Sequence, residues 1–349
     1  MRLRNNVWEQ KLLKIKPEHL FRHLLSVISP QKSSGPQINP SESHPVQQRV
    51  PWLYAFWKFS RPHTIIGTSL SVVALYLMAI ALSTTSVIGD SLVQLLGSWI
   101  ACLGGNIYIV GLNQLEDVEI DKINKPHLPI AAGEFSRRQA VMIIAFSGTV
   151  ALLSALLLGQ YLLLTVGISL AIGTAYSLPP IRLKRFPFWA ALCIFTVRGV
   201  IVNLGLFLHF SWVLQKEQVI PVPVWALTLF VLVFTFAIAI FKDIPDMEGD
   251  KQYNITTFTI QLGKAAVFNL SLWVITVCYV GMILAGVVKL PLLNATFVVI
   301  THLLALALLW WRSTRVDLQD KVAIASFYQF IWKLFFLEYL IFPAACLLA

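Results

Sequence analysis

The stretch VPVWALTLFVLVFTFAIAIFKDIPDMEGDK, residues 222–251, holds the two features that decide the fold. Its first 20 residues contain no charged side chain, and about 20 apolar residues are what an α-helix needs to cross a bilayer. Four carboxylates follow within the next ten residues. The stretch therefore predicts a membrane-spanning helix that ends in an acidic cluster.

The rest of the chain has the same apolar character. Of its 349 residues 57% are hydrophobic and only 13% are charged, whereas roughly 25% are charged in an ordinary soluble domain. Further apolar runs of membrane-spanning length give nine expected spans. They cover residues 64–82, 92–112, 139–158, 161–178, 188–210, 222–241, 266–286, 291–311 and 326–347. We expect an all-α membrane protein with nine transmembrane helices.

Basic residues between these spans predict the orientation of the chain. After the first span they gather in alternate connections, and the opposite connections hold only Lys216 and Lys289. Cytoplasmic connections are enriched in Lys and Arg. We therefore expect the amino terminus and the basic connections on the cytoplasmic side of the membrane, and the carboxyl terminus on the other side.

An earlier stretch, NQLEDVEIDK at residues 113–122 (the first acidic stretch), has the same pattern as the one at residues 243–251 (the second acidic stretch). Both contain Asp-x-Glu-x-Asp-Lys, at 117–122 and 246–251, with an offset of 129 residues. They end the expected spans two and six, so they share one orientation and form a parallel repeat. At about 100° per residue, Asn113, Asp117 and Asp121 fall on one helix stripe, and Asp243, Asp246 and Asp250 fall on another.

Carboxylates stacked on a helix face repel one another unless a cation neutralises them. Oxygen ligands without His or Cys favour Mg²⁺ over Mn²⁺ or Ca²⁺, and protein-bound Mg²⁺ commonly completes its coordination with substrate phosphates. We expect the two stretches to form a metal-diphosphate site. The candidate metal ligands are Asn113, Asp117, Asp121, Asp243, Asp246 and Asp250. The candidate catalytic residues among them are Asp117, Asp121, Asp246 and Asp250.

Cationic and hydroxyl side chains near this end of the spans are candidates for binding the diphosphate. They are Arg61, Lys122, Lys125, Tyr176, Arg182, Lys184, Arg198 and Lys251. For each Lys and Arg outside a span, setting the membrane topology is the alternative role. Arg198 lies inside span five, where a charge is costly and either faces a polar space or pairs with a carboxylate. In the last span we expect Lys333 and Glu338 to pair with each other.

Residues 1–50 are expected to be a polar amino-terminal extension, preceding a multi-pass domain at 51–349. The extension ends in a Pro- and Ser-rich linker at 30–48, preceded by a basic amphipathic segment that favours the membrane surface, with a plastid transit peptide as the alternative. The net charge of +10 does not indicate nucleic-acid binding. Ten of the 27 basic residues precede the first span, where attraction to anionic lipid headgroups explains them.

Five long runs carry a resemblance to a known family. They are FSRPHTIIGTSLSV (59–72), GLNQLEDVEIDKINKPHLPIAAGEFS (111–136), GTAYSLPPIRLKRF (173–186), AIFKDIPDMEGDK (239–251) and ASFYQFIWKLFFLEYLIFP (325–343). On these runs the chain resembles the UbiA superfamily of intramembrane aromatic prenyltransferases over residues 52–349. The resemblance implies a helical bundle with a central cavity, in which the six acidic and amide residues above bind Mg²⁺ and a prenyl diphosphate.

The resemblance also implies a reaction. A phytyl group passes from phytyl diphosphate to homogentisate, with loss of carbon dioxide and diphosphate, in tocopherol (vitamin E) biosynthesis within a cyanobacterial rather than a plastid membrane. Three alternatives stay open: transfer of a solanesyl chain to homogentisate, prenylation of another aromatic or quinone-pathway acceptor, and a polytopic transporter. Transporter sites usually lie at the bilayer midplane, whereas these carboxylates gather at one face.

Overall fold

The computed structural model describes residues 51–83, 91–215, 219–253 and 255–349. Within these ranges all regular structure is helical, which confirms the expected all-α class. The expected amino-terminal extension, with its amphipathic segment and linker, falls on residues 1–50 and lies outside the described residues.

In the described part of the chain, nine helices are long and apolar enough to cross a membrane, and each overlaps one of the nine expected spans. Eight are single helices: α5 (Pro62–Ala81), α6 (Ser91–Glu116), α8 (Arg137–Leu158), α9 (Gln160–Ser177), α12 (Val222–Phe241), α15 (Lys264–Val287), α16 (Ala295–Ser313) and α17 (Lys321–Leu347). The fifth span joins α10 (Pro187–Phe195), the π-helix η3 (Thr196–Ile201) and α11 (Val202–Gln215).

Large apolar side chains cover the outside of the bundle. On α8, Phe146 keeps 72% of its surface exposed and Leu157 keeps 85%. Exposed patches of this kind mark interaction or membrane surfaces, and lipid tails are the partner that spans of this length require. The protein is therefore an integral membrane protein.

Small residues let neighbouring spans approach closely, as is usual between membrane helices. Between α6 and α8, a Cβ added at Gly104 would lie 2.8 Å from the Ser147 carbonyl oxygen, and one added at Gly148 would lie 2.7 Å from the Tyr108 ring. The sharp start of α8 has a local cause. The Ser136 hydroxyl accepts from the Gln139 backbone N–H while the Gln139 side chain accepts from the Ser136 backbone, forming a capping box.

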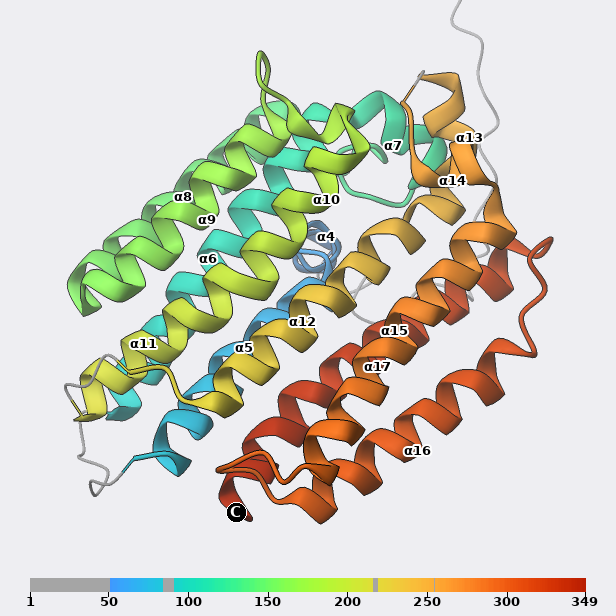
Figure 1. Ribbon diagram of the computed structural model, residues 1–349. Coiled ribbons are helices and arrows are strands. Elements are labelled where there is room, and N and C mark those ends of the chain that lie inside the picture. Colours follow the sequence, from blue (N-terminus) through green and yellow to red (C-terminus); the bar gives the residue numbers. More distant parts are fainter. Residues whose placement is uncertain (1–50, 84–90, 216–218, 254) are drawn as a thin grey trace, which may run out of the picture. The chain divides into compact units, whose positions relative to one another are not determined.

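The centre of the bundle is formed by α5, α12 and α17, which Figure 1 shows running through the middle of the molecule. Helix α5 packs against α6, α11 and α17, and α12 packs against α15, α17 and η3. Of the nine spans, α12 and α17 bury the largest share of their residues within the described part of the chain. These helices carry the aromatic core of the protein.

Short helices cap one end of the bundle. They are α4 (Pro51–Phe59), α7 (Val118–Asn124), η2 (Leu183–Arg185), α13 (Asp243–Gln252) and α14 (Phe258–Leu262). Helices α7 and α13 directly follow the spans α6 and α12, and they pack against each other at the upper right of Figure 1. The ends of spans two and six, 129 residues apart in sequence, therefore meet in space.

Candidate active site

The first acidic stretch lies across a break between two helices. Helix α6 ends at Glu116 and α7 begins at Val118, while Asp117 between them is not helical (φ −112°, ψ 18°). The expectation of one continuous helix stripe through Asn113, Asp117 and Asp121 is therefore wrong in this detail. Helical spacing nevertheless survives the break, because the Asp117 N–H donates to the Asn113 carbonyl at 3.1 Å and the Asp121 N–H donates to the Asp117 carbonyl at 2.8 Å.

The second acidic stretch forms a helix of its own. Helix α13 starts at Asp243, with only Lys242 between it and the end of α12, and carries Asp243, Asp246 and Asp250 on consecutive turns as expected. The Lys242 Nζ lies 3.2 Å from an Asp243 carboxylate oxygen. The acidic residues that follow the apolar span α12 therefore lie at the end of the bundle.

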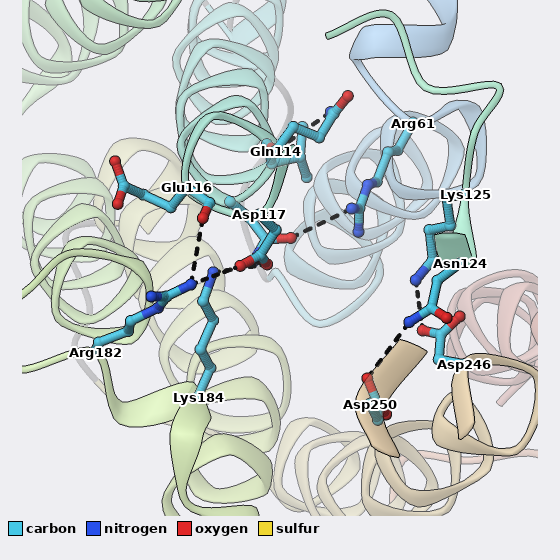
Figure 2. Close-up of polar contacts among 12 residues, drawn as sticks. Arg61, Gln114, Glu116, Asp117, Asn124, Lys125, Arg182, Lys184, Asp246 and Asp250 are labelled. Carbon is cyan, nitrogen blue, oxygen red and sulfur yellow. Dashed lines mark hydrogen bonds and ion pairs between the residues drawn. The ribbon is translucent and has the colours of Figure 1, made fainter. Parts of the chain in front are cut away.

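Direct contacts join the two acidic stretches (Figure 2). The Asn124 side chain accepts from the Gly249 backbone N–H at 3.0 Å and donates to Asp250 Oδ1 at 3.4 Å. The Lys125 ammonium forms an ion pair with Asp246. Two segments that lie more than 120 residues apart in sequence therefore form one site.

Gly249 makes the close approach of α7 and α13 possible. A Cβ at this position would lie 2.3 Å from Asn124 Oδ1 and 2.6 Å from Asn124 Cγ, so the Asn124 side chain would have to leave its position. We expect Gly249→Ala to break both Asn124 hydrogen bonds and lower the rate of the site's reaction by roughly 10- to 100-fold, because small displacements of positioned groups are costly in catalysis.

The control for this prediction is Gly167→Ala, since a Cβ at this helical glycine meets no atom within 4 Å. That variant should keep its activity and gain a little helix stability, because Ala is the better helix former. Activity is measured on purified membranes after matching the amounts of folded protein. Equal activities of the two variants would contradict the role given to Gly249.

Cationic side chains from two other segments contact the first acidic stretch at Asn113 and Asp117. Arg182 Nη2 donates to Asp117 Oδ1 at 3.0 Å and to the Glu116 carbonyl at 3.2 Å, and the Lys184 Nζ donates to Asp117 Oδ2 at 2.7 Å (Figure 2). Arg61 Nη2 donates to Asn113 Oδ1 at 3.3 Å. Burial lowers the pKa of Lys184, and the Asp117 carboxylate opposes that shift. The candidate residues Arg61, Lys125, Arg182 and Lys184 therefore gather at the carboxylates.

Lys122 and Lys251, the last residues of the two repeats, point away from the carboxylates. Both are exposed, and Lys122 pairs with the neighbouring Glu119 at 2.7 Å. Helix geometry explains this result, because adjacent residues lie about 100° apart on a helix and their preceding aspartates face inward. Tyr176 at the end of α9 lies within electrostatic reach of Lys242, Asp243 and Asp117, on the side of the site.

Two residues inside the spans differ from expectation. Arg198, expected at the diphosphate, contacts neither acidic stretch and lies over the rings of Trp332 and Phe335. The expected Lys333–Glu338 pair is wrong. Glu338 is fully buried and lies 3.2 Å from His302 Nε2, because α16 packs beside α17 and offers a closer partner than the same helix does.

Two carboxylates of the site, Asp121 and Asp250, form no ion pair within the described part of the chain. Asp121 Oδ2 is buried and has no hydrogen-bond partner. Burial raises the pKa of Asp121 to about 6, and the charges of Asp117 and Asp246, one from each stretch, add to the shift. Burial also raises the pKa of Asp250 to about 7, with further contributions from Asp246 and Asp243. An added cation between the stretches would stabilise both groups.

The donor set fits a hard divalent ion such as Mg²⁺, because it contains carboxylate and amide oxygens and an unpartnered Asp121 oxygen. Among the described residues, no three His, Cys, Asp or Glu side chains already lie close enough to hold a metal ion. Instead, Lys125 forms an ion pair with Asp246, and Arg182 and Lys184 form ion pairs with Asp117. Metal binding therefore requires these ion pairs to exchange partners.

Asn124 and Gly249 join the two parts of the candidate site, and neither is among the candidate residues identified from the sequence. Asn124 lies one helical turn beyond Asp121, so the spacing that selected Asp117 and Asp121 also leads to it. Gly249 had a weaker signal, a glycine inside an otherwise polar helical segment. Its partner Asn124 could not be read from spacing alone.

The chain is similar in sequence to known proteins. The sequence matches the UbiA prenyltransferase family over residues 71–334. It is 58% identical over 294 residues to homogentisate phytyltransferase from Synechocystis sp., covering 84% of this chain and 96% of that protein. It is 36% identical over 320 residues to the chloroplastic homogentisate solanesyltransferase of Arabidopsis thaliana, covering 88% of this chain and 81% of that protein.

A solved structure has the same fold. The UbiA homologue from Archaeoglobus fulgidus, bound to GPP and Mg²⁺, superposes with a TM-score of 0.58 at 14% identity, covering 83% of this chain and 99% of that one. The family match and the long, highly identical relative lead to the same conclusion. The chain belongs to the UbiA prenyltransferase family.

Proposed function

We propose that this protein transfers the phytyl group of phytyl diphosphate to homogentisate, with release of diphosphate and carbon dioxide. The observation that carries the reaction class is the meeting of two carboxylate-bearing segments, ringed by Lys and Arg, at one end of an apolar bundle. The identity of 58% to a homogentisate phytyltransferase, against 36% to a solanesyltransferase, supports phytyl as the transferred chain.

In this proposal Asn113, Asp117, Asp121, Asp243, Asp246 and Asp250 hold Mg²⁺ together with the diphosphate. Arg61, Lys125, Arg182 and Lys184 bind the diphosphate oxygens, and Tyr176 lies beside them. The present ion pairs support this division, because a magnesium diphosphate supplies a cation to each carboxylate and an anion to each ammonium or guanidinium group. When bound, Mg²⁺ offsets the negative charge that grows on the leaving diphosphate.

The reaction follows from these charges. The allylic carbon–oxygen bond breaks, and its electron pair leaves with the diphosphate, which the site's cations stabilise. A ring carbon of homogentisate donates an electron pair to the phytyl cation and loses its proton. The carboxylate departs as carbon dioxide, and the electron pair it leaves behind takes up a proton, so the side chain becomes a methyl group.

The membrane setting suits the phytyl chain and the allylic cation formed from it. A phytyl chain is insoluble in water, and water would capture the allylic cation before the ring does. Lys and Arg residues in the loops at the carboxylate end of the bundle support the cytoplasmic side as the location of that end. The relative from Synechocystis sp. supports a cyanobacterial membrane as the location.

The test uses purified membranes that contain the protein, supplied with Mg²⁺ and with homogentisate labelled at its carboxyl carbon. Phytyl, solanesyl and geranylgeranyl diphosphates are added together in equal amounts, so that they compete. We expect phytylated product and labelled carbon dioxide in equal amounts, with the phytyl chain preferred. A preference for solanesyl diphosphate would overturn the choice of chain. Absence of any prenylated homogentisate would overturn the function.

A further inference from the structure

Arg198 is a cation deep inside a membrane span that has no acidic partner. No Asp or Glu in the described part of the chain forms an ion pair with it. Its guanidinium carbon lies 4.9 Å from the Trp332 ring centre and 5.6 Å from that of Phe335. Cation–π contacts offset only a part of the free-energy cost of removing a charge from water. The residue therefore lacks an anion.

The backbone holds Arg198 in place at some cost. It lies in the π-helix η3, a helix type that often marks functional positions. Gly199 allows η3 to pack tightly on α12, since a Cβ there would lie 2.7 Å from the Leu232 Cα. Asn203 donates to the Gly199 carbonyl at 2.9 Å and accepts from the Tyr339 hydroxyl at 2.9 Å. These contacts fix the direction from which the guanidinium enters the bundle.

The surroundings of Arg198 combine positive charge with flat aromatic faces. Trp332, one of the two rings under Arg198, also packs against His63, with ring centres 4.9 Å apart. The charges of Arg61, Arg198 and Lys125 all act on His63. Arg198 keeps a small part of its surface accessible, whereas Trp332 and Phe335 are buried. This is the chemistry that complements an aromatic carboxylate.

The position of Arg198 relative to the carboxylates suits the second substrate. A Cβ built on Gly67 would lie 3.4 Å from Arg198 Nη1, so the guanidinium lies beside Gly67 on α5. Gly67 is six residues beyond Arg61, which is about 9 Å along a helix at 1.5 Å per residue. Arg61 itself reaches the first acidic stretch through Asn113. A small acceptor at Arg198 would therefore lie about 9 Å along α5 from Arg61, at the bundle side of the proposed diphosphate site.

We propose that Arg198 binds the carboxylate of the aromatic acceptor, with the acceptor ring packed against the aromatic side chains near Trp332. The assignment rests on the proposed function, since homogentisate is an arylacetate. A guanidinium can hold a carboxylate with two parallel hydrogen bonds. The acceptor's anion also neutralises a charge that would otherwise repel the allylic cation, so cation formation is favoured only when the acceptor is present.

The test compares the wild-type protein with Arg198→Gln in purified membranes. Its matched control is Lys333→Gln. Lys333 follows Trp332 in the sequence, but its side chain is exposed on the outside of α17. The KM values for homogentisate and for phytyl diphosphate are measured separately. The neutral methyl ester of homogentisate is used as a competitor, and its inhibition constant is compared with that of an unreactive arylacetate acid.

We expect Arg198→Gln to raise the KM for homogentisate by roughly 30-fold or more, the loss typical of truncating one partner of a buried charge pair. The KM for phytyl diphosphate and the inhibition constant of the ester should change by less than about threefold, and Lys333→Gln should match the wild type. The preference of the site for the acid over the ester should disappear.

If instead the KM for phytyl diphosphate rises, Arg198 binds the diphosphate and the assignment is overturned. An unchanged acid-over-ester preference would do so as well. If Arg198→Gln does not accumulate in membranes, Arg198→Lys keeps the charge but loses the two-pronged geometry, and a partial loss of the acid preference is expected. If the wild-type protein fails to prenylate homogentisate, it is the proposed function that fails.

Discussion

Asp246→Asn is expected to reduce the rate of prenyl transfer by about 10³-fold or more, while the protein still inserts and folds in membranes. The substitution keeps the size of the side chain and removes the charge that pairs with Lys125 and, in our proposal, with Mg²⁺. Loss of one group that stabilises a transition-state charge typically costs 10²- to 10³-fold, and loss of a metal ligand adds to that. The rate is measured under saturating homogentisate and phytyl diphosphate.

The repeat contains its own control for this experiment. Glu248 lies two residues further along the same helix, but its side chain is 65% exposed and pairs with Lys321 at 2.6 Å, away from the site. Glu119 is its counterpart in the first repeat and pairs with Lys122. Glu248→Gln and Glu119→Gln should keep near-normal activity, whereas Asp117→Asn should fail as Asp246→Asn does. Near-normal turnover by the two Asn variants would refute the metal-diphosphate assignment.

Removal of divalent cations is expected to abolish product formation altogether. Asp121 and Asp250 are buried carboxyl groups with raised pKa values, and the Lys and Arg partners of Asp117 and Asp246 would otherwise have to bind the diphosphate and the carboxylates at once. Treatment with EDTA removes the ion, and graded addition of single metals restores it. Product is quantified from labelled phytyl diphosphate.

The order of metals that restore activity provides a sharper test. The site offers only oxygen ligands, so Mg²⁺ should restore the full rate, Mn²⁺ a part of it, and Ca²⁺ little, because Ca²⁺ prefers more ligands and longer bonds. Zn²⁺ should be a poor substitute without His or Cys ligands. Full activity in EDTA would contradict any role for a metal ion.

The nine spans could be predicted because each is an apolar run of membrane-spanning length, a signal that does not depend on tertiary contacts. The placement of both acidic stretches at one end of the bundle followed from their parallel orientation and from basic residues in alternate connections. The exposure of Lys122 and Lys251 was not predicted, although each follows an aspartate by about 100° on a helix and so faces another way.

Other features depended on contacts that no local pattern contains. The break of helix at Asp117 coincides with the ion pairs to Arg182 and Lys184, which come from a connection 65 residues later. Glu338 finds His302 on a different helix, so spacing along α17 misidentified its partner. Arg198 could be recognised as an isolated intramembrane charge, but its aromatic neighbours come from the last span and appear only in the folded bundle.

The contact between α7 and α13 means that neither half of the chain contains a complete site. The two stretches nevertheless differ at matching positions, because Asn113 presents an amide where the second stretch is preceded by the cation of Lys242. The two acidic helix ends can therefore treat the two ends of an asymmetric ligand differently.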